Sequence, residues 1–119
     1  MGTRPERVSP SLPGVADVVA QLGEWPSFHD AEILRVHIER NGRSVVTIRL
    51  TAAVYKQKQV TFTFERIADL SLGGEDINVQ NVISSLLVEQ DGKLITVEFG
   101  PCYGLSGSIK AESVTVSVD

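Results

Sequence analysis

Residues 82–100 read VISSLLVEQDGKLITVEFG, and this stretch decides the fold because two strand patterns flank a turn signal. Apolar and polar side chains alternate on both sides of Asp91-Gly92, the dipeptide that two-residue type I′ hairpin turns prefer. A loop at that dipeptide places Val88 opposite Ile95 and brings the two apolar faces to the same side. The sequence therefore predicts an antiparallel hairpin with one buried face.

Two stretches upstream alternate in the same way and read as half-buried strands. Their apolar even-numbered members are Leu34, Val36 and Ile38 within residues 32–40, and Val46, Ile48, Leu50, Ala52 and Val54 within residues 44–54. A three-residue loop over 40–42 pairs Val36 with Val46 and Leu34 with Ile48, whereas a two-residue loop would put the apolar faces out of step. We therefore expect a hairpin whose even positions face the core.

The remaining strand signals are shorter. Residues 60–67, VTFTFERI, alternate with Val and Phe inward, and LGGED at 72–76 breaks that pattern. Residues 54–59, VYKQKQ, are typical of a solvated connection. The tail 102–119 carries apolar residues on one parity before positions 111–113 and on the other after them, which predicts a bulge or bend there.

A short helix is predicted ahead of the strands. Within residues 14–23 the apolar residues Val15, Val18, Val19 and Leu22 recur at helical spacing, and Gly23 fits a C-cap. We expect residues 1–13 to form a flexible leader and residues 14–119 a single domain. The predicted class is α+β, with the helix packed on a mainly antiparallel, meandering sheet of six to seven strands.

Composition narrows the kind of protein. The 119 residues carry 11 Lys plus Arg and 15 Asp plus Glu, a net charge of −4, which disfavours a nucleic-acid partner. No apolar run reaches the roughly 20 residues that span a bilayer, so no membrane association is expected. Cys102 is the single cysteine and cannot form an intramolecular disulfide, which is typical of a reducing compartment such as the cytoplasm.

Few residues are suited to catalysis or metal binding. His29, Asp30, Glu32 and His37 are potential ligands, but the strand pattern places His37 and Glu32 on opposite faces. Cys102 lies between Pro and Gly in a turn-like context. We therefore expect no catalytic residue, no metal site and no cofactor, and keep a small hydrolase or metal-dependent enzyme built on His29, Asp30 and Glu32 as the alternative.

Three aromatic residues stand near turn signals. Trp25 and Phe28 flank Pro26 where the helix pattern gives way to the first strand pattern. They are candidates either for a plug that closes the helix against the sheet or for an exposed anchor at a protein interface. Tyr103, between Cys102 and Gly104, allows the same two interpretations.

Polar residues of the same stretch are candidate contacts. Asp30 suits an Asx-type turn into the strand, in which its carboxylate accepts main-chain N–H bonds and His29 holds that carboxylate or a nearby carbonyl. Alternatively, His29 and Asp30 form a polar recognition corner together with Glu32. Several acidic residues could attract a basic partner, namely Glu24, Asp30, Glu32, Asp69, Glu75 and Asp76. Of these, Glu75 and Asp76 form the acidic end of a predicted loop and are the best exposed candidates.

The segment WPSFHDAEILRVHI, after a short helix, resembles the bacterial immunity protein 50 family, as does YGLSG before the last strand. The likeness covers roughly residues 14–118 and is sharpest over 25–32, followed by Tyr103-Gly104-Leu105. The residues that match the family's N-terminal signature are Trp25, Phe28, His29, Asp30 and Glu32. The resemblance implies a small intracellular α+β protein that binds and neutralises the toxin of a polymorphic toxin system without being an enzyme.

The resulting expectation is a cytoplasmic immunity protein whose partner is a protein toxin domain. A self-associating structural module is a further alternative, since exposed strand edges can pair between copies. We expect a monomer or a weak homodimer.

Overall fold

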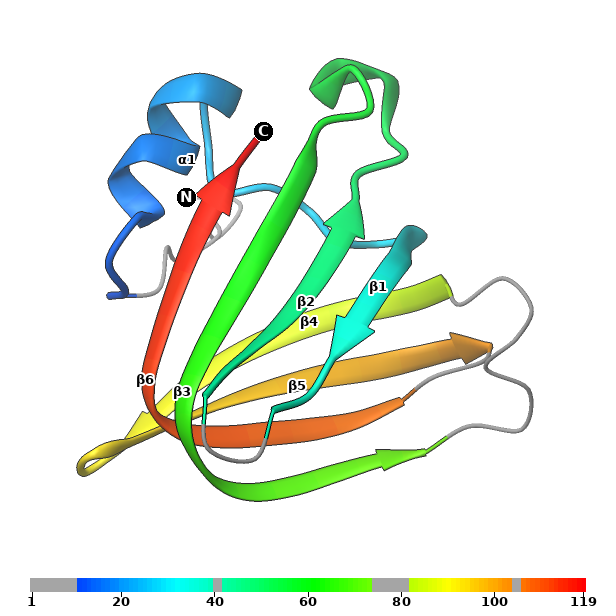
Figure 1. Ribbon diagram of the computed structural model, residues 1–119. Coiled ribbons are helices and arrows are strands. Elements are labelled where there is room, and N and C mark those ends of the chain that lie inside the picture. The colour runs from blue at the N-terminus through cyan, green and yellow to red at the C-terminus, as the bar shows by residue number, and fades with distance from the viewer. Residues whose placement is uncertain (1–10, 40–41, 74–81, 104–105) are drawn as a thin grey trace, which may run out of the picture.

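The structure is a computed structural model that describes residues 11–39, 42–73, 82–103 and 106–119. In that part of the chain one short α-helix precedes six antiparallel strands, in agreement with the predicted α+β class (Figure 1). The elements are α1 (Val15–Leu22), β1 (Ala31–His37), β2 (Arg43–Arg49), a 3₁₀ turn η1 (Ala53–Tyr55), β3 (Gln59–Gly73), β4 (Val82–Asp91), β5 (Leu94–Tyr103) and β6 (Ser106–Val118).

Two long strands serve both halves of the sheet. β3 has 15 residues and β6 has 13, and they pair along almost their whole lengths. β2 pairs only with the first half of β3, and β5 only with the first half of β6. The sheet therefore curls into a closed barrel of order β1-β2-β3-β6-β5-β4. The predicted meander describes β1 to β3 and β4 to β6, but not the β3–β6 pairing that joins them.

The bend of these two strands has a local cause (Figure 1). The register of the β3–β6 pair shifts between Ile67 and Asp69, which makes Ala68 an extra residue, and Arg66 adopts a left-handed φ of 57°. On β6 the buried residues change parity between Ala111 and Val114, which confirms the bend predicted near 111–113. Because a bulge bends and twists its strand, the two halves of the sheet fold over one another.

The core lies between these two layers. Its largest fully buried side chains include Phe62 and Phe64 from β3, Ile48 from β2, and Phe99 from β5. Each such side chain stabilises the fold by about 1.5–3 kcal/mol through removal of its apolar surface from water. The alternation predicted for β2 and for the first half of β3 is confirmed by the burial of their even-numbered residues.

The helix ends as its sequence predicts. Gly23 adopts a left-handed φ of 87°, and its N–H donates to the Val19 carbonyl at 2.8 Å, which is a helix C-cap. Val15 and Val18 are buried among the side chains of the strands. The helix thus contributes two valines to the same core.

The start of the helix lies tight against β6. The Pro13 carbonyl accepts a hydrogen bond from the Val116 N–H at 3.0 Å. A Cβ on Gly14 would lie 1.7 Å from the Val116 oxygen, so only glycine fits there. This contact occupies a main-chain donor of β6 that could otherwise pair with another strand. Of the leader predicted over 1–13, residues 1–10 lie outside the described residues.

The β1–β2 register agrees with the prediction at one end and departs from it at the other. Val36 pairs with Val46, as predicted. Leu34, however, is not opposite Ile48, because a register shift places Ile33 in that position. The cause is a bulge at Leu34, which lets Ile33 enter the core although its odd position predicted the opposite face.

From this bulge onward the apolar residues of β1, and Ile38 just after its end, are not buried, which corrects the predicted inward row. Leu34 is 43% exposed, and Val36 and Ile38 are each 38% exposed. In the part of the chain that the structure describes, β4 pairs with β1 only at Ala31 and Glu32. Among the described residues, the remainder of β1 pairs only with β2.

The β4–β5 hairpin forms, but its predicted register is wrong by two residues. Val88 pairs with Val97 rather than with Ile95, and the two loop residues are Gly92 and Lys93. Gly92 has a φ of 63°, so the left-handed position comes first in the loop. A shift of two leaves every side chain on its predicted face, and alternation cannot distinguish the two registers.

Two further predictions need correction. Residues 54–59 are not wholly solvated, because Tyr55 in η1 is buried, with 4% of its surface exposed, while Val54 beside it is exposed. The strand predicted over 60–67 continues to Gly73, since its second half pairs with β6.

Candidate functional site

The WPSFHDAE stretch forms the corner between α1 and β1, and its aromatic residues point into the core. The Trp25 ring centroid lies 5.6 Å from that of Phe28 and 6.3 Å from that of Phe62 on β3. Phe28 and Phe62 are 6.0 Å apart, which completes a three-ring cluster. These separations are typical of favourable aromatic pairs. Trp25 is buried, so its placement corresponds to the plug and not to the exposed anchor.

Tyr55, in the connection between β2 and β3, forms hydrogen bonds to the same corner. Its hydroxyl accepts the Ser27 N–H at 3.1 Å and donates to a carboxylate oxygen of Glu24 at 2.6 Å. A bond to a charged acceptor is stronger than a neutral one. Tyr55 was not predicted to be a structural residue, because its only sign in the sequence is a single aromatic residue next to the Lys and Gln residues at 56–59.

Asp30 fastens the corner through its backbone. It adopts a left-handed φ of 63°, which Asp tolerates better than most residues. Its N–H donates to the Ile83 carbonyl on β4, and its own carbonyl accepts from the Thr51 hydroxyl, both at 2.9 Å. The predicted Asx-type turn was to be held by hydrogen bonds to the Asp30 carboxylate. In the structure the turn is instead held by hydrogen bonds of the Asp30 N–H and carbonyl groups.

The side chains of His29 and Asp30 are directed to solvent. His29 Nε2 lies 3.5 Å from a carboxylate oxygen of Asp30, and the two side chains are 69% and 61% exposed. The His29 N–H also donates to the Ser27 hydroxyl at 3.3 Å. The predicted contact between His29 and Asp30 is therefore present as an exposed pair.

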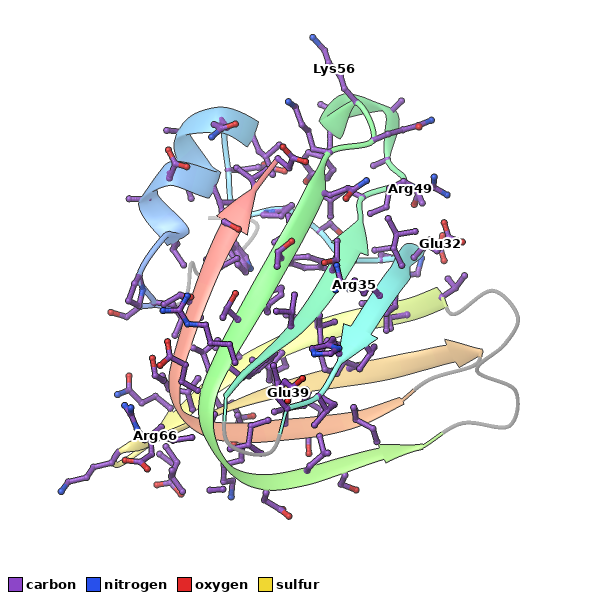
Figure 2. The ribbon with its side chains drawn as sticks, in the orientation of Figure 1. Glu32, Arg35, Glu39, Arg49, Lys56 and Arg66 are labelled. Carbon is purple, nitrogen blue, oxygen red and sulfur yellow. The ribbon has the colours of Figure 1, made fainter. Side chains whose placement is uncertain are left out.

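Glu32 interacts with Arg49 and not with His29 or Asp30. It lies opposite Arg49 across the β1–β2 pair, and the Arg49 guanidinium donates to its carboxylate. Figure 2 shows these two side chains directed toward one another. Within the described residues no group of three His, Cys, Asp or Glu side chains could hold a metal ion. His29, Asp30 and Glu32 thus do not form the converging cluster that the enzyme alternative requires.

The other predicted contacts lie at the margin of the described chain. Tyr103 is the last residue of β5, and its backbone pairs with Val82. The side chain of Tyr103, like Glu75 and Asp76, lies outside the described residues.

A second candidate surface is the outer face of the layer that contains β4 and β5. We call it the acidic face and define it by Asp69, Leu87, Glu89, Glu98 and Lys110. Leu87 pairs with Glu98, Glu89 pairs with Thr96, and Thr96 pairs in turn with Lys110, which pairs with Asp69. Because neighbouring strands lie about 4.8 Å apart, these side chains form one continuous surface across four strands.

The acidic face combines unpaired charge with an exposed apolar group. Leu87 is 49% exposed, Glu89 and Glu98 are exposed beside it, and Asp69 is exposed on β3 at the opposite side of the face. Among the described residues none of these three carboxylates takes part in an ion pair. Only Asp69 was considered as an acidic contact from sequence. The others were missed because they are scattered along the chain and only strand pairing brings them together.

Comparison with known proteins gives no match to a family model, a curated protein or a solved structure. No helix in the described part of the chain is long and apolar enough to cross a membrane.

Proposed function

We propose that this chain is a non-enzymatic immunity protein that binds and neutralises a toxin domain of a polymorphic toxin system in the cytoplasm. Residues 14–119 act in this proposal as one binding domain, with α1 docked on the sheet. The observation that carries the proposal is the acidic face, where exposed Leu87 lies beside the unpaired carboxylates of Glu89 and Glu98 and a third unpaired carboxylate, that of Asp69, lies farther across the same face.

The negative charge of the acidic face favours a partner with a basic surface. The chain has a net charge of −4, and the carboxylates of Asp69, Glu89 and Glu98 on this surface are unpaired, so the surface attracts a basic protein. Complementary potentials raise the association rate and suppress wrong partners. Leu87 supplies the apolar centre that a protein interface needs inside a polar rim. A basic toxin domain with an apolar pocket fits this combination.

The placement of the family-like residues supports the same function. The Trp25 and Phe28 rings pack against each other in the corner between α1 and β1, and the Asp30 N–H donates a hydrogen bond to β4. The residues that resemble the family are those that build the fold. The outer faces of the sheet can therefore differ from one immunity protein to another and match a particular toxin. An immunity protein of this kind acts by occupying its partner and needs no catalytic group.

The proposal is tested by co-expression with the C-terminal domain encoded by the gene directly upstream. We expect that domain to arrest bacterial growth when expressed alone, and the chain to restore growth and co-purify with it at equal stoichiometry. The proposal is contradicted if the upstream product is harmless, or if the chain neither binds it nor restores growth.

Charge variants test the surface. Glu89→Lys combined with Glu98→Lys should weaken the complex at least about tenfold, because two attractions become repulsions. The control is Asp17→Lys with Glu112→Lys, which changes the net charge equally at exposed positions off the acidic face. Equal weakening by both pairs would remove the acidic face from the proposal and leave only a net-charge effect.

A further inference from the structure

The connection between β2 and β3 ends in an exposed tip that combines apolar and basic groups. We call it the η1 tip and define it by Ala53, Val54, Lys56, Gln57 and Lys58. Val54 is 74% exposed, more than any other large apolar side chain among the described residues. Lys56 and Gln57 are exposed beside it, and Lys58 is half-buried. Figure 2 shows the Lys56 side chain pointing away from the body of the molecule.

The η1 tip is held in one conformation by bonds within the chain. The Lys56 N–H donates to the Ala53 carbonyl, and the Lys58 N–H donates to the Tyr55 carbonyl, both at 3.0 Å. Tyr55 itself is buried, and its hydroxyl bonds to the corner after α1. A surface that is already ordered loses less conformational entropy on binding, so the η1 tip is suited to recognition.

Lys56 and Gln57 keep long side chains where the backbone favours glycine. Their φ angles are 54° and 59°, in the left-handed region that residues with a Cβ rarely adopt. At two other left-handed positions that are open to solvent, the chain has Gly23 and Gly92. Within the described chain neither the Lys56 nor the Gln57 side chain has a hydrogen bond or ion pair that offsets the strain. Strained residues without an internal partner point to an external one.

The acidic face carries the opposite charge and an apolar group of its own. There Leu87 is 49% exposed beside the carboxylates of Glu89 and Glu98, and in the η1 tip Val54 is exposed beside lysines. None of these carboxylates and lysines takes part in an ion pair among the described residues. Opposite charges bring two such surfaces together, and their apolar groups can then bury each other.

We infer that the η1 tip of one copy of this chain binds the acidic face of a second copy. Val54 then packs on Leu87 of the second copy, and the lysines of the tip lie against its Glu89 and Glu98. Figure 1 shows η1 at the upper end of the molecule and β4 and β5 below it, so a tip cannot reach the acidic face of its own chain. The contact is heterologous, and it leaves one tip and one acidic face free at the ends of the assembly.

This contact uses the surface that the proposed function assigns to the toxin. A toxin domain and a second copy therefore compete for the acidic face. The association is weak, because the tip has five residues, against about 20–30 on each side of a standard interface. Self-association needs no toxin, so it is tested on the chain alone and can hold or fail independently of the immunity function.

Sedimentation velocity over a concentration series tests the contact in the native chain. We expect the weight-average mass to rise with concentration, and an increase in salt from about 50 to about 500 mM to raise the Kd of self-association at least about tenfold, since the charges that meet are exposed. A chain that remains a monomer up to the millimolar range, or a Kd that does not respond to salt, would overturn the proposal.

The tip variant, Lys56→Gln with Lys58→Gln, tests the basic side of the contact. It should raise the Kd at least about tenfold with an unchanged circular dichroism spectrum, because two attractions are lost. The control variant, Arg35→Gln with Arg43→Gln, removes the same charge from exposed positions on β1 and β2 and should leave the Kd within about twofold of the native value. Equal weakening by the two variants would contradict a contact at the tip.

A mixture of two deficient variants tests that one tip meets one acidic face. The face variant, Glu89→Lys with Glu98→Lys, keeps a native tip, and the tip variant keeps a native acidic face. At concentrations where each variant alone is monomeric, their equimolar mixture should form a complex of one copy of each with the native Kd. The complex should grow no further, because its free tip lacks lysines and its free face lacks carboxylates. A mixture that stays monomeric, although both variants give the native circular dichroism spectrum, sinks the proposal.

The upstream toxin domain gives a separate comparison. A saturating amount should dissociate the copies of the native chain, and the tip variant should bind that domain as tightly as the native chain does. A tip variant that loses the toxin domain, beside a native chain that stays monomeric, would place the tip in the toxin interface and rule out the contact between copies.

Discussion

At the residue scale, the corner after α1 is held by aromatic side chains that pack together and by polar groups that form hydrogen bonds. The three rings of Trp25, Phe28 and Phe62 fill space, and the Tyr55 hydroxyl binds both the Ser27 main chain and the Glu24 carboxylate. A buried ring with a bonded polar tip is the usual arrangement for tyrosine. Tyr55 therefore joins two parts of the chain that lie 28 residues or more apart.

Tyr55→Phe should lower the free energy of unfolding by about 2 kcal/mol, because it removes a bond to a charged carboxylate and leaves the Ser27 N–H without this acceptor. Chemical denaturation followed by circular dichroism measures the change. Val54→Ala, at the exposed neighbouring position, is the control and should stay within about 0.5 kcal/mol of the native chain. Equal losses in both variants would mean that η1, and not the hydroxyl, is responsible.

At the element scale, the barrel depends on how closely β3 and β6 approach. Gly107 has a φ of 131°, and a Cβ there would lie 1.8 Å from the Ser71 oxygen. Gly92 in the β4–β5 loop is also left-handed, but a Cβ there would meet nothing within 4 Å. Both positions have a positive φ that strains any other residue, but only Gly107 lies against a neighbouring strand.

Gly107→Ala should therefore cost about 3 kcal/mol or more, since it adds a clash with the β3 backbone to the conformational strain. Gly92→Ala should cost only about 1 kcal/mol, the strain alone. Thermal unfolding of the two variants beside the native chain provides the comparison. The close β3–β6 contact would be wrong if Gly107→Ala were no less stable than Gly92→Ala.

At the scale of the whole molecule, β3 and β6 belong to both layers, so neither layer can be lost alone. The corner around Trp25 also contacts β3 through Phe62 and β4 through the Asp30 N–H. A structure linked in this way unfolds as one cooperative unit.

We expect urea unfolding to give a single transition, with coincident curves from Trp25 fluorescence and far-ultraviolet circular dichroism. Trp25 is the single tryptophan, so its fluorescence reports on the corner, while the dichroism reports on the strands. Two separated midpoints would show that the corner and the barrel are independent, and would contradict the single domain expected over residues 14–119.

The amino-acid sequence by itself determined the helix and its Gly23 cap, the strand identities and most strand faces, because these follow from spacing along the chain and from local turn chemistry. It could not determine the β4–β5 register, since a shift of two preserves every face, nor the bulge that turns Ile33 inward. Only the tertiary structure decided that β3 pairs with β6, that Tyr55 is buried, and that Glu89, Glu98 and Asp69 share one surface. These features depend on contacts between residues distant in the chain, which leave no periodic signal. The FHDAE residues suggested a recognition site by their chemistry, but the fold uses the Phe28 ring and the Asp30 main chain to close the corner.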